Sequence, residues 1–530
     1  MRDKETMVSF LRAQSGRTSP ANAVTYLATA SSLAVMLIMQ SIAVQAQQPA
    51  ELVIHNGLII NDTGRMAADI RIRGDKIVEI APKIVAAPGA REIDASNKFL
   101  MPGIIDTHTH LPLDPTIAPP AKGNQDNIVT GGRAALAGGV TLLGDFIALK
   151  NDEDPNVYAD RNIALIRKNS IADVYIHASV NPVDVPKGSP PDPLTQRKTF
   201  EALAARGIVS TGEDFMAREA YDKNSLAWMK LFRVSGEAGV VSMIHAEDYS
   251  ILTDAQQRLT SENEGTGLTL KNFAQAAPII AEVLAVQRSV AIAEATGSPI
   301  FILHTTSGRA LAVIEDAQRR GLLVYAETRP WNLFGTEQGY QKPDGGIYVG
   351  GPPLRPKWDQ DALWEGIRKG TIDTIGTDHT AFSKEAKLDP TQNINDKRMG
   401  QNTLQDYPPM MFSEGVMKDR ITLEQMVAVT STNAAKIFGM YPRKGVIAVG
   451  SDADIVIWDP AKKKILKDSD QLSKAGYSTY AGKEVTGLPI TTIRRGEIVW
   501  DNGKILGQPG SGQFIPGGKF QRPTLRPLSD

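Results

Sequence analysis

The sequence of 530 residues contains no cysteine and only seven histidines. Without thiols, the chain can form neither disulfide bonds nor zinc–cysteine clusters, and it has no thiol nucleophile. Any metal site must therefore be built from histidine, carboxylate and lysine side chains. The positions of the few histidines are informative for that reason.

The sequence also lacks an excess of charge of either sign. Its 58 lysine and arginine residues balance 59 aspartate and glutamate residues. This balance gives no electrostatic reason to expect nucleic acid or a membrane surface as a partner. The hydrophobic content of 42% is that of an ordinary globular protein. We therefore expect a small-molecule substrate and no nucleic acid.

An apolar run near the N-terminus needs separate treatment. A segment with four basic residues, Arg2–Arg17, precedes the apolar run Tyr26–Met39, which is too short to span a bilayer comfortably. Val44 and Ala46 place small residues at the −3 and −1 positions of a cleavage site. We predict a secretory signal peptide and a mature protein secreted to the periplasm, with no membrane contact after cleavage. An uncleaved anchor is the alternative.

Short alternating segments at both ends of the mature chain predict β-strands. From Glu51 to about Lys98 they are separated by Asn-Gly and Gly-Asp turns, and "GSDADIVIWDP" and "TTIRRGEIVWDNGKI" look similar near the C-terminus. We expect a small β-sandwich domain built from both terminal segments. The predicted parts of the chain are residues 1–46 (signal peptide), 47–103 (first part of the sandwich), 104–439 (barrel) and 440–530 (second part of the sandwich and C-terminal tail).

The middle of the chain repeats a strand-then-helix pattern. Its eight short apolar runs are "GIIDTHTH", "VTLLGDFI", "ADVYIHAS", "RGIVST", "VVSMIHAE", "PIFILHTT", "LLVYAETR" and "TIDTIGTDH". Helix-like segments separate most of them, which predicts the α/β class and a (β/α)₈ TIM-like barrel. An open doubly wound sheet is the alternative, but no glycine-rich phosphate loop follows the first run.

Four of the eight runs end in residues that bind metals. The first ends in His108 and His110, the fifth in His245, the sixth in His304 and the eighth in Asp378. The active site of such a barrel lies at the C-terminal ends of its strands, where these side chains would meet. Residues two apart on a strand point to the same face, so His108 and His110 can bind one metal together. The other three histidines are expected to have structural roles; they are His55, His177 and His379.

This ligand set favours Zn²⁺, with Mn²⁺, Fe²⁺ or Co²⁺ as alternatives. A zinc ion with an open position lowers the pKa of its bound water to ~7 and so provides hydroxide for attack on a carbonyl carbon. Asp378 can take the proton of that water and return it to a leaving nitrogen. The chemistry predicted from these residues is hydrolysis of an amide-like bond, with Asp378 as a catalytic residue.

Several of these segments also resemble one known family. "MPGIIDTHTH", "IHAED", "ILHTTSG", "AETRPWNLF", "GGPPLRP", "IGTDHTAF" and residues 430–460 closely resemble the dihydropyrimidinase/hydantoinase branch of the amidohydrolase superfamily, from about Glu51 to Phe514. The resemblance implies hydrolysis of a cyclic amide, imide or ureide of hydantoin or dihydropyrimidine type. It also implies a homodimer or homotetramer. One metal would be held by His108, His110 and Asp378, and a second by His245 and His304.

The resemblance further implies two main-chain contacts to the substrate ring. One is Gly351, just before "PPLR", where many relatives have serine. The other is Asn402 in "GQNTLQDY". Because main-chain contacts survive a side-chain change, Gly351 is a mild departure from the family.

Two departures are larger. Relatives carry a carboxylated lysine that bridges the two metals, in a context like K-x-F-M-A-Y, whereas this chain reads "EDFMAR". Glu213 therefore falls at the lysine position and Arg218 at that of a tyrosine that helps to polarise the substrate carbonyl. Glu213 is a carboxylate, but its reach is shorter by ~4 Å. The nearest lysine downstream, Lys230, lies in a segment with helical periodicity.

These departures leave several hypotheses open. In the first hypothesis, Glu213 bridges two metals, either because its strand bulges inward or because the metals move toward it. In the second the site holds one metal, and in the third the site is inactive. Arg218 replaces the tyrosine as an oxyanion donor, selects an anionic substrate, or is an exposed loop residue. A linear amide or N-acyl amino acid hydrolase is therefore a second candidate. A non-catalytic dihydropyrimidinase-like assembly protein is a third, although such relatives have typically lost ligands that this chain keeps.

Overall fold

The structure, a computed structural model, describes residues 51–117, 123–150, 153–180, 193–219, 224–262, 269–389 and 399–521. The predicted signal peptide lies outside the described residues. Residues 51–530 belong to one compact unit, so the predicted division at residues 103 and 439 stays a prediction.

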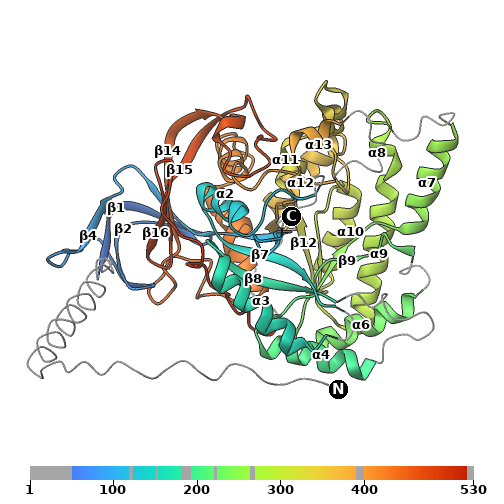
Figure 1. Ribbon diagram of the computed structural model, residues 1–530, viewed down its shortest axis with the longest axis horizontal. Helices are drawn as coiled ribbons and strands as arrows, with labels where there is room; N and C mark the ends of the chain where they lie inside the picture. Colours follow the sequence, from blue (N-terminus) through green and yellow to red (C-terminus); the bar gives the residue numbers. More distant parts are fainter. Residues whose placement is uncertain are drawn as a thin grey trace, which may run out of the picture. The chain divides into compact units, whose positions relative to one another are not determined.

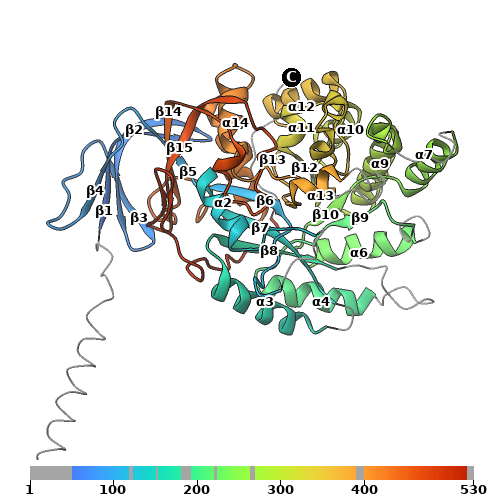
Figure 2. The ribbon, with the colours of Figure 1, turned by 45° about the horizontal axis from the view of Figure 1, so that its top comes forward.

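Within the described chain, eight parallel strands form a barrel (Figures 1 and 2). They are β6 (Ile104–Thr109), β7 (Val140–Ala148), β8 (Asp173–Ser179), β9 (Asp214–Phe215), β10 (Ser242–His245), β11 (Ile300–Ile302), β12 (Val324–Thr328) and β13 (Thr374–Ile375). Strands β6–β8 and β9–β13 form two sheets. Parallel bridges between Ala178 and Thr211 and between Thr109 and His379 join them at both seams. The predicted (β/α)₈ barrel is confirmed.

Helices cover the outside of this barrel, as Figure 2 shows. The main ones are α2 (Thr130–Gly138), α3 (Pro155–Asn169), α4 (Pro193–Ala205), α6 (Ser225–Glu237), α9 (Ile279–Thr296), α10 (Gly308–Arg319) and α12 (Lys357–Lys369). Their ends follow local sequence signals: the Asp154 side chain caps the amides at the start of α3, and Gly297, at φ 70°, ends α9. The helical stretch Phe273–Thr296, which ends with α9, is long and apolar enough to cross a membrane, but 56% of its most apolar window is buried inside the protein.

Further helical segments lie in the connections between the strands and at the edges of the barrel. They are α7 (Tyr249–Glu262), α8 (Phe273–Ala276), α11 (Pro330–Phe334), η1 (Glu337–Gln341), η2 (Gly345–Tyr348), α13 (Lys384–Leu388), α14 (Tyr407–Met410), η3 (Met411–Val416), α15 (Leu423–Val427), η4 (Ala428–Thr432), α16 (Asn433–Ile437) and η5 (Asp468–Asp470). Lys230 lies within α6, in agreement with the helical periodicity of its surroundings.

The two terminal segments form one further sheet beside the barrel, blue and red in Figure 1. Its nine strands are β1 (Leu52–Asn61), β2 (Gly64–Arg73), β3 (Lys76–Ala81), β4 (Arg91–Asp94), β5 (Phe99–Pro102), β14 (Ile455–Ile465), β15 (Glu484–Arg494), β16 (Glu497–Asp501) and β17 (Lys504–Ile505). The path is continuous because β5 pairs with β14. Ile54 and Ile70 of the N-terminal half share one buried cluster with Ile457 and Ile493 of the C-terminal half, so the sheet encloses a core between its halves as a sandwich does.

A buried ion cluster joins this sheet to the barrel. Lys444 is 1% exposed and lies 3.1 Å from Asp173 of β8 and 3.0 Å from Asp452. It also donates a hydrogen bond to Asp454 just before β14. The C-terminal tail reaches the same strand, since Phe514 pairs with Val174.

Candidate metal centre

The six predicted ligand residues gather in two groups at the C-terminal ends of the barrel strands. The first group contains His108, His110 and Asp378, and the second contains Glu213, His245 and His304. Within each group, one ligand atom from every residue lies within 4.8 Å of the others.

In the first group, two imidazole nitrogens and one carboxylate oxygen face one point. His108 Nε2 lies 3.2 Å from His110 Nε2. Asp378 Oδ1 lies 3.4 Å from the former nitrogen and 3.2 Å from the latter. This is the donor set and spacing that surround a tetrahedral or five-coordinate zinc-type ion.

In the second group, the Glu213 carboxylate lies between the two sets of histidines. Its Oε1 is 3.0 Å from His245 Nδ1 and 3.3 Å from His304 Nε2. Its Oε2 is 3.6 Å from His110 Nε2, which belongs to the first group. The two oxygens of one carboxylate thus face different groups.

A bulge in the fourth strand carries Glu213 to this position. Ser210 pairs with Val241, 31 residues later, whereas Asp214 pairs with Ile244, only 30 residues later. One extra residue is therefore accommodated between these pairs, as in a β-bulge. An inward bulge was one of the ways predicted for the shorter glutamate to reach the metals.

Two contacts stabilise the bulge. The Met243 amide, which lies between the two pairs on β10, donates to the Thr211 hydroxyl at 3.1 Å. Gly212 packs so closely on β8 that a Cβ there would lie 2.6 Å from the Ser179 nitrogen. A glycine at this position lets the two backbones approach.

Two further carboxylates orient histidines proposed as metal ligands, and neither was predicted from the sequence. Glu327 accepts from His108 Nδ1 at 2.9 Å, and Glu247 accepts from His245 Nε2 at 2.8 Å. Both carboxylates are buried. Each leaves the other ring nitrogen of its histidine free to face the ligand group, as partners of metal-binding histidines do. Glu327 could have been found from the sequence, because it lies near the end of the seventh apolar run.

The carboxylates around His245 favour positive charge there, whereas burial and the neighbouring His245 lower the pKa of His304 to about 4. Burial lowers the pKa of His245, but Glu213 and Glu247 outweigh this effect and raise the pKa to about 10. A divalent cation supplies the positive charge that such a carboxylate-rich, buried site attracts. The residues present therefore fit a metal centre.

Two of the proposed ligands are among the described non-glycine residues with a positive φ. His304 has φ 33° and Asp378 has φ 53°, in the left-handed region that non-glycine residues seldom adopt. Such conformations cost about 1–3 kcal/mol each and cluster at functional sites.

The other three histidines belong to neither group. His177 is buried in the barrel, where its Nε2 donates to the Thr107 carbonyl oxygen and its Nδ1 bonds the Ser210 hydroxyl. Burial lowers its pKa to about 3. His379 Nε2 lies 3.0 Å from Asp126. His55 lies in the β-domain, outside the barrel.

The residues predicted to contact substrate lie beside these groups. The Arg329 guanidinium donates hydrogen bonds both to the Asp378 carboxylate and to the Gly351 carbonyl oxygen. Gln401, the neighbour of Asn402, pairs with His379, the neighbour of Asp378. The Asn402 side chain donates a hydrogen bond to the Tyr477 carbonyl oxygen, so the side chain itself is not directed at a ligand.

Arg218 lies on the exposed side of the second group. Its guanidinium carbon is 4.6 Å from the centre of the Phe215 ring. The Phe215 ring in turn lies 4.8 Å from the imidazole of His245. Among the described residues, Arg218 has no hydrogen bond or ion pair, so its five donors are available.

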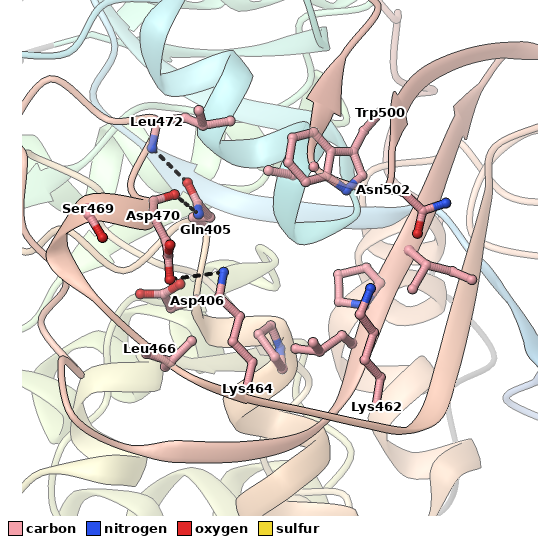
Figure 3. Close-up of a pocket in the computed structure, with 16 residues that line it drawn as sticks. Gln405, Asp406, Lys462, Lys464, Leu466, Ser469, Asp470, Leu472, Trp500 and Asn502 are labelled. Atoms are coloured by element: carbon pink, nitrogen blue, oxygen red, sulfur yellow. Dashed lines mark hydrogen bonds and ion pairs between the residues drawn. The ribbon is translucent and has the colours of Figure 1, made fainter.

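A separate cavity of about 400 Å³ lies between α2, the Gln405–Asp406 segment and strands β14–β16 (Figure 3). Lys464 faces Asp470 there at 3.1 Å. None of the six proposed ligands lines this cavity, so it is distinct from the metal centre.

The barrel and the two ligand groups define the class of protein: a (β/α)₈ barrel with a candidate metal centre at the C-terminal ends of its strands. The amidohydrolase family profile matches residues 99–499, and the chain belongs to this family. The D-hydantoinase of Ralstonia pickettii is 32% identical over 478 residues, which cover 89% of this chain and 100% of the relative. The dihydropyrimidinase of Dictyostelium discoideum is 28% identical over 501 residues, which cover 92% and 93%.

Solved structures agree with this assignment. The D-hydantoinase of Bacillus sp. AR9 aligns with a TM-score of 0.80 at 31% identity, covering 89% of this chain and 100% of that chain. The L-hydantoinase of Arthrobacter aurescens aligns with a TM-score of 0.77 at 27% identity, covering 88% and 99%. The resemblance to the hydantoinase and dihydropyrimidinase branch is confirmed.

Proposed function

We propose that this chain is a metal-dependent amidohydrolase that opens a cyclic amide, imide or ureide of hydantoin or dihydropyrimidine type. The observation that carries the proposal is the Glu213 carboxylate, whose two oxygens face the two groups of histidines. The relatives named D-hydantoinase and dihydropyrimidinase support the choice of substrate class.

We propose that the centre holds two Zn²⁺ ions, with Mn²⁺, Fe²⁺ or Co²⁺ as alternatives. His108, His110 and Asp378 would hold one ion, His245 and His304 the other, and Glu213 would contact both. Metals at such a site activate water and polarise a carbonyl group.

The residues of the chain supply the remaining steps. Asp378 accepts the proton of the attacking water and returns it to the leaving ring nitrogen, a role that its place at the end of β13 permits. The main chain at Gly351 and Asn402 holds the ring. Arg218 contacts the carbonyl oxygen or an anionic substituent of the substrate with its unpaired guanidinium.

A screen of ring and linear substrates tests the proposal. Metal-loaded protein is incubated with hydantoins, dihydropyrimidines, cyclic imides and N-acyl amino acids, beside the variant Asp378→Asn. We expect hydrolysis of at least one ring class by the wild type and none by the variant. Turnover of N-acyl amino acids alone would establish the second candidate, a linear amide hydrolase, which the free guanidinium of Arg218 favours.

Metal analysis separates the enzyme from a non-catalytic assembly protein. The five ligands other than Glu213 are all present and lie together, so we expect a transition metal in purified or reconstituted protein. Finding none in either preparation would contradict the enzyme proposal. Sedimentation would measure the proposed homodimer or homotetramer.

We also propose that the mature protein is periplasmic, on the basis of the signal-like sequence of residues 1–46. N-terminal sequencing of the protein from the secreted fraction tests this, and we expect a mature chain that begins at Gln47. A chain that retains Met1 would support the alternative of an uncleaved anchor.

A further inference from the structure

Arg329 follows β12 and lies buried between Asp378 and the loop that contains Gly351. Its side chain is 1% exposed. Nη1 donates to Asp378 Oδ2 and to the Gly351 oxygen, both at 2.8 Å, and Nη2 donates to the Pro352 oxygen at 2.6 Å. The Trp331 ring packs 4.9 Å from its guanidinium carbon. One guanidinium therefore connects a proposed metal ligand to a proposed substrate-binding loop.

The two oxygens of Asp378 have different neighbours. Oδ2 accepts from Arg329, while Oδ1 faces the ring nitrogens of His108 and His110. Rotation of a carboxylate about its terminal torsion is otherwise broad. The planar guanidinium, with donors in a fixed fork, sets this rotation and keeps Oδ1 toward the ligand group.

The loop after η2 has an unusual balance of donors and acceptors. Pro352 and Pro353 have no N–H group. The amides of Gly350 and Gly351 make no hydrogen bond to the described part of the chain. The Gly351 and Pro352 carbonyls are both taken by Arg329, so this loop offers two main-chain donors and few free acceptors.

A second buried cation holds the other end of the loop. Lys387, 1% exposed, donates to the carbonyls of Val349 and Gly400. Gln401 also donates to the Val349 carbonyl, at 3.0 Å. Lys387 thus ties the Gly351 loop to the segment that leads to Asn402.

We propose that Arg329 is a positioning residue for the reaction proposed above: it fixes the proton-transferring carboxylate of Asp378 and the ring-binding loop at Gly351 in one geometry. Lys387 positions the loop through the carbonyls of Val349 and Gly400. The proposal rests on the proposed function for its kinetic consequences, whereas the link between Arg329 and Asp378 rests on geometry alone.

Four variants test this proposal: Arg329→Gln, Arg329→Lys, Lys387→Met and, as a matched control, Arg494→Lys. Arg494 is also fully buried, but it bonds Ile171, just before β8, and Glu497 of β16. For each variant we would measure kcat and KM on a ring substrate, the metal-to-protein ratio, and the visible absorption spectrum of cobalt-loaded protein.

For Arg329→Gln we expect kcat to fall by about 10²-fold, the effect of a misplacement of about 1 Å at a catalytic group. The metal-to-protein ratio should stay at the wild-type value and the cobalt spectrum should change. Arg329→Lys should recover part of kcat, because an ammonium can still reach one acceptor. Lys387→Met should raise KM with little change in kcat, and Arg494→Lys should change neither.

Two results would overturn the proposal. One is an Arg329→Gln protein whose kcat, KM and cobalt spectrum equal those of Arg494→Lys. The other is a loss of rate fully explained by loss of metal, with the rate per bound metal unchanged. If the wild type opens no ring but Arg329→Gln still alters the cobalt spectrum, the proposed function fails and the positioning role stands. If Arg329→Gln does not fold, Arg329→Lys gives the same comparison.

Discussion

Shortening Glu213 by one methylene is the sharpest test of its proposed bridging position. The variant Glu213→Asp keeps the charge but withdraws the carboxylate by about 1.3–1.5 Å. In the structure, Oε1 lies 3.0 Å from His245 and 3.3 Å from His304, while Oε2 lies 3.6 Å from His110. Metal–ligand distances tolerate only about ±0.2 Å, so the shortened side chain cannot serve both groups.

We expect the metal content of Glu213→Asp to fall from about two ions per chain to about one, and its rate to fall by at least ~10²-fold. Glu213→Gln keeps the reach but loses the charge and one acceptor oxygen, so we expect the same loss of metal. Mass spectrometry of dialysed, metal-reconstituted protein measures the content, and hydrolysis of the best ring substrate measures the rate.

The variant Glu213→Lys tests whether the bulge has moved the backbone of the fourth strand inward. A carboxylated lysine would be ~4 Å longer than glutamate, and the bulge has already moved the backbone inward. We therefore expect that added bicarbonate does not restore this variant. Two metals and a wild-type rate in Glu213→Asp, or full activity of Glu213→Lys with bicarbonate, would refute the reasoning.

Three further predictions concern the bulge, a buried ion cluster and a surface histidine. Gly212→Ala should reduce metal content as Glu213→Asp does, because its Cβ would lie 2.6 Å from the Ser179 nitrogen and displace the bulge; a full metal content would contradict this. Lys444→Met should lower the free energy of unfolding by about 1.5–3 kcal/mol in a urea titration, since it removes a buried cation from three carboxylates, although Arg495 still pairs with Asp173 and Arg443 with Asp452. Lys463→Met, at a 66% exposed side chain, should change it by less than about 1 kcal/mol. Hydrogen bonding to Asp69 raises the pKa of His55 above its ordinary value of 6.5, so protonated His55 stabilises the fold below pH 6.5 and this stabilisation is lost as pH rises through the raised pKa. The melting temperature of His55→Gln should therefore lie further below that of the wild type at about pH 5.5 than at about pH 9. An equal difference at both pH values would refute this prediction.

The barrel and the grouping of most residues proposed as metal ligands could be predicted because both depend on local patterns. Short apolar runs separated by helical segments define parallel strands, and the C-terminal ends of such strands meet at one face. His108 and His110 are two apart on β6, so their shared direction follows from strand geometry alone. A histidine at the end of a run, such as His304, needs only the position of the run.

The parts that could not be predicted depend on contacts between distant segments. The bulge before β9 is a change of register against β10, and it requires the close approach of Gly212 to Ser179. The apolar run that marks the fourth strand ends before Glu213 and carries no sign of the extra residue. Arg329 and Asp378 lie 49 residues apart, and only the fold brings them together.

Glu327 shows why these distant contacts matter to the centre as a whole. Its Oε1 accepts from the His108 ring at 2.9 Å and from the His304 amide at 3.4 Å, and its Oε2 accepts from Thr107. One buried carboxylate therefore touches a residue of each ligand group, and it bonds the backbone of His304 where φ is 33°. Strained conformations persist only where their surroundings over-determine them. Glu327 at His304 and Arg329 at Asp378 supply that constraint, which means that the two groups are held in one relation by the protein itself. The geometry that the Glu213 carboxylate spans is thus fixed by residues outside both ligand groups.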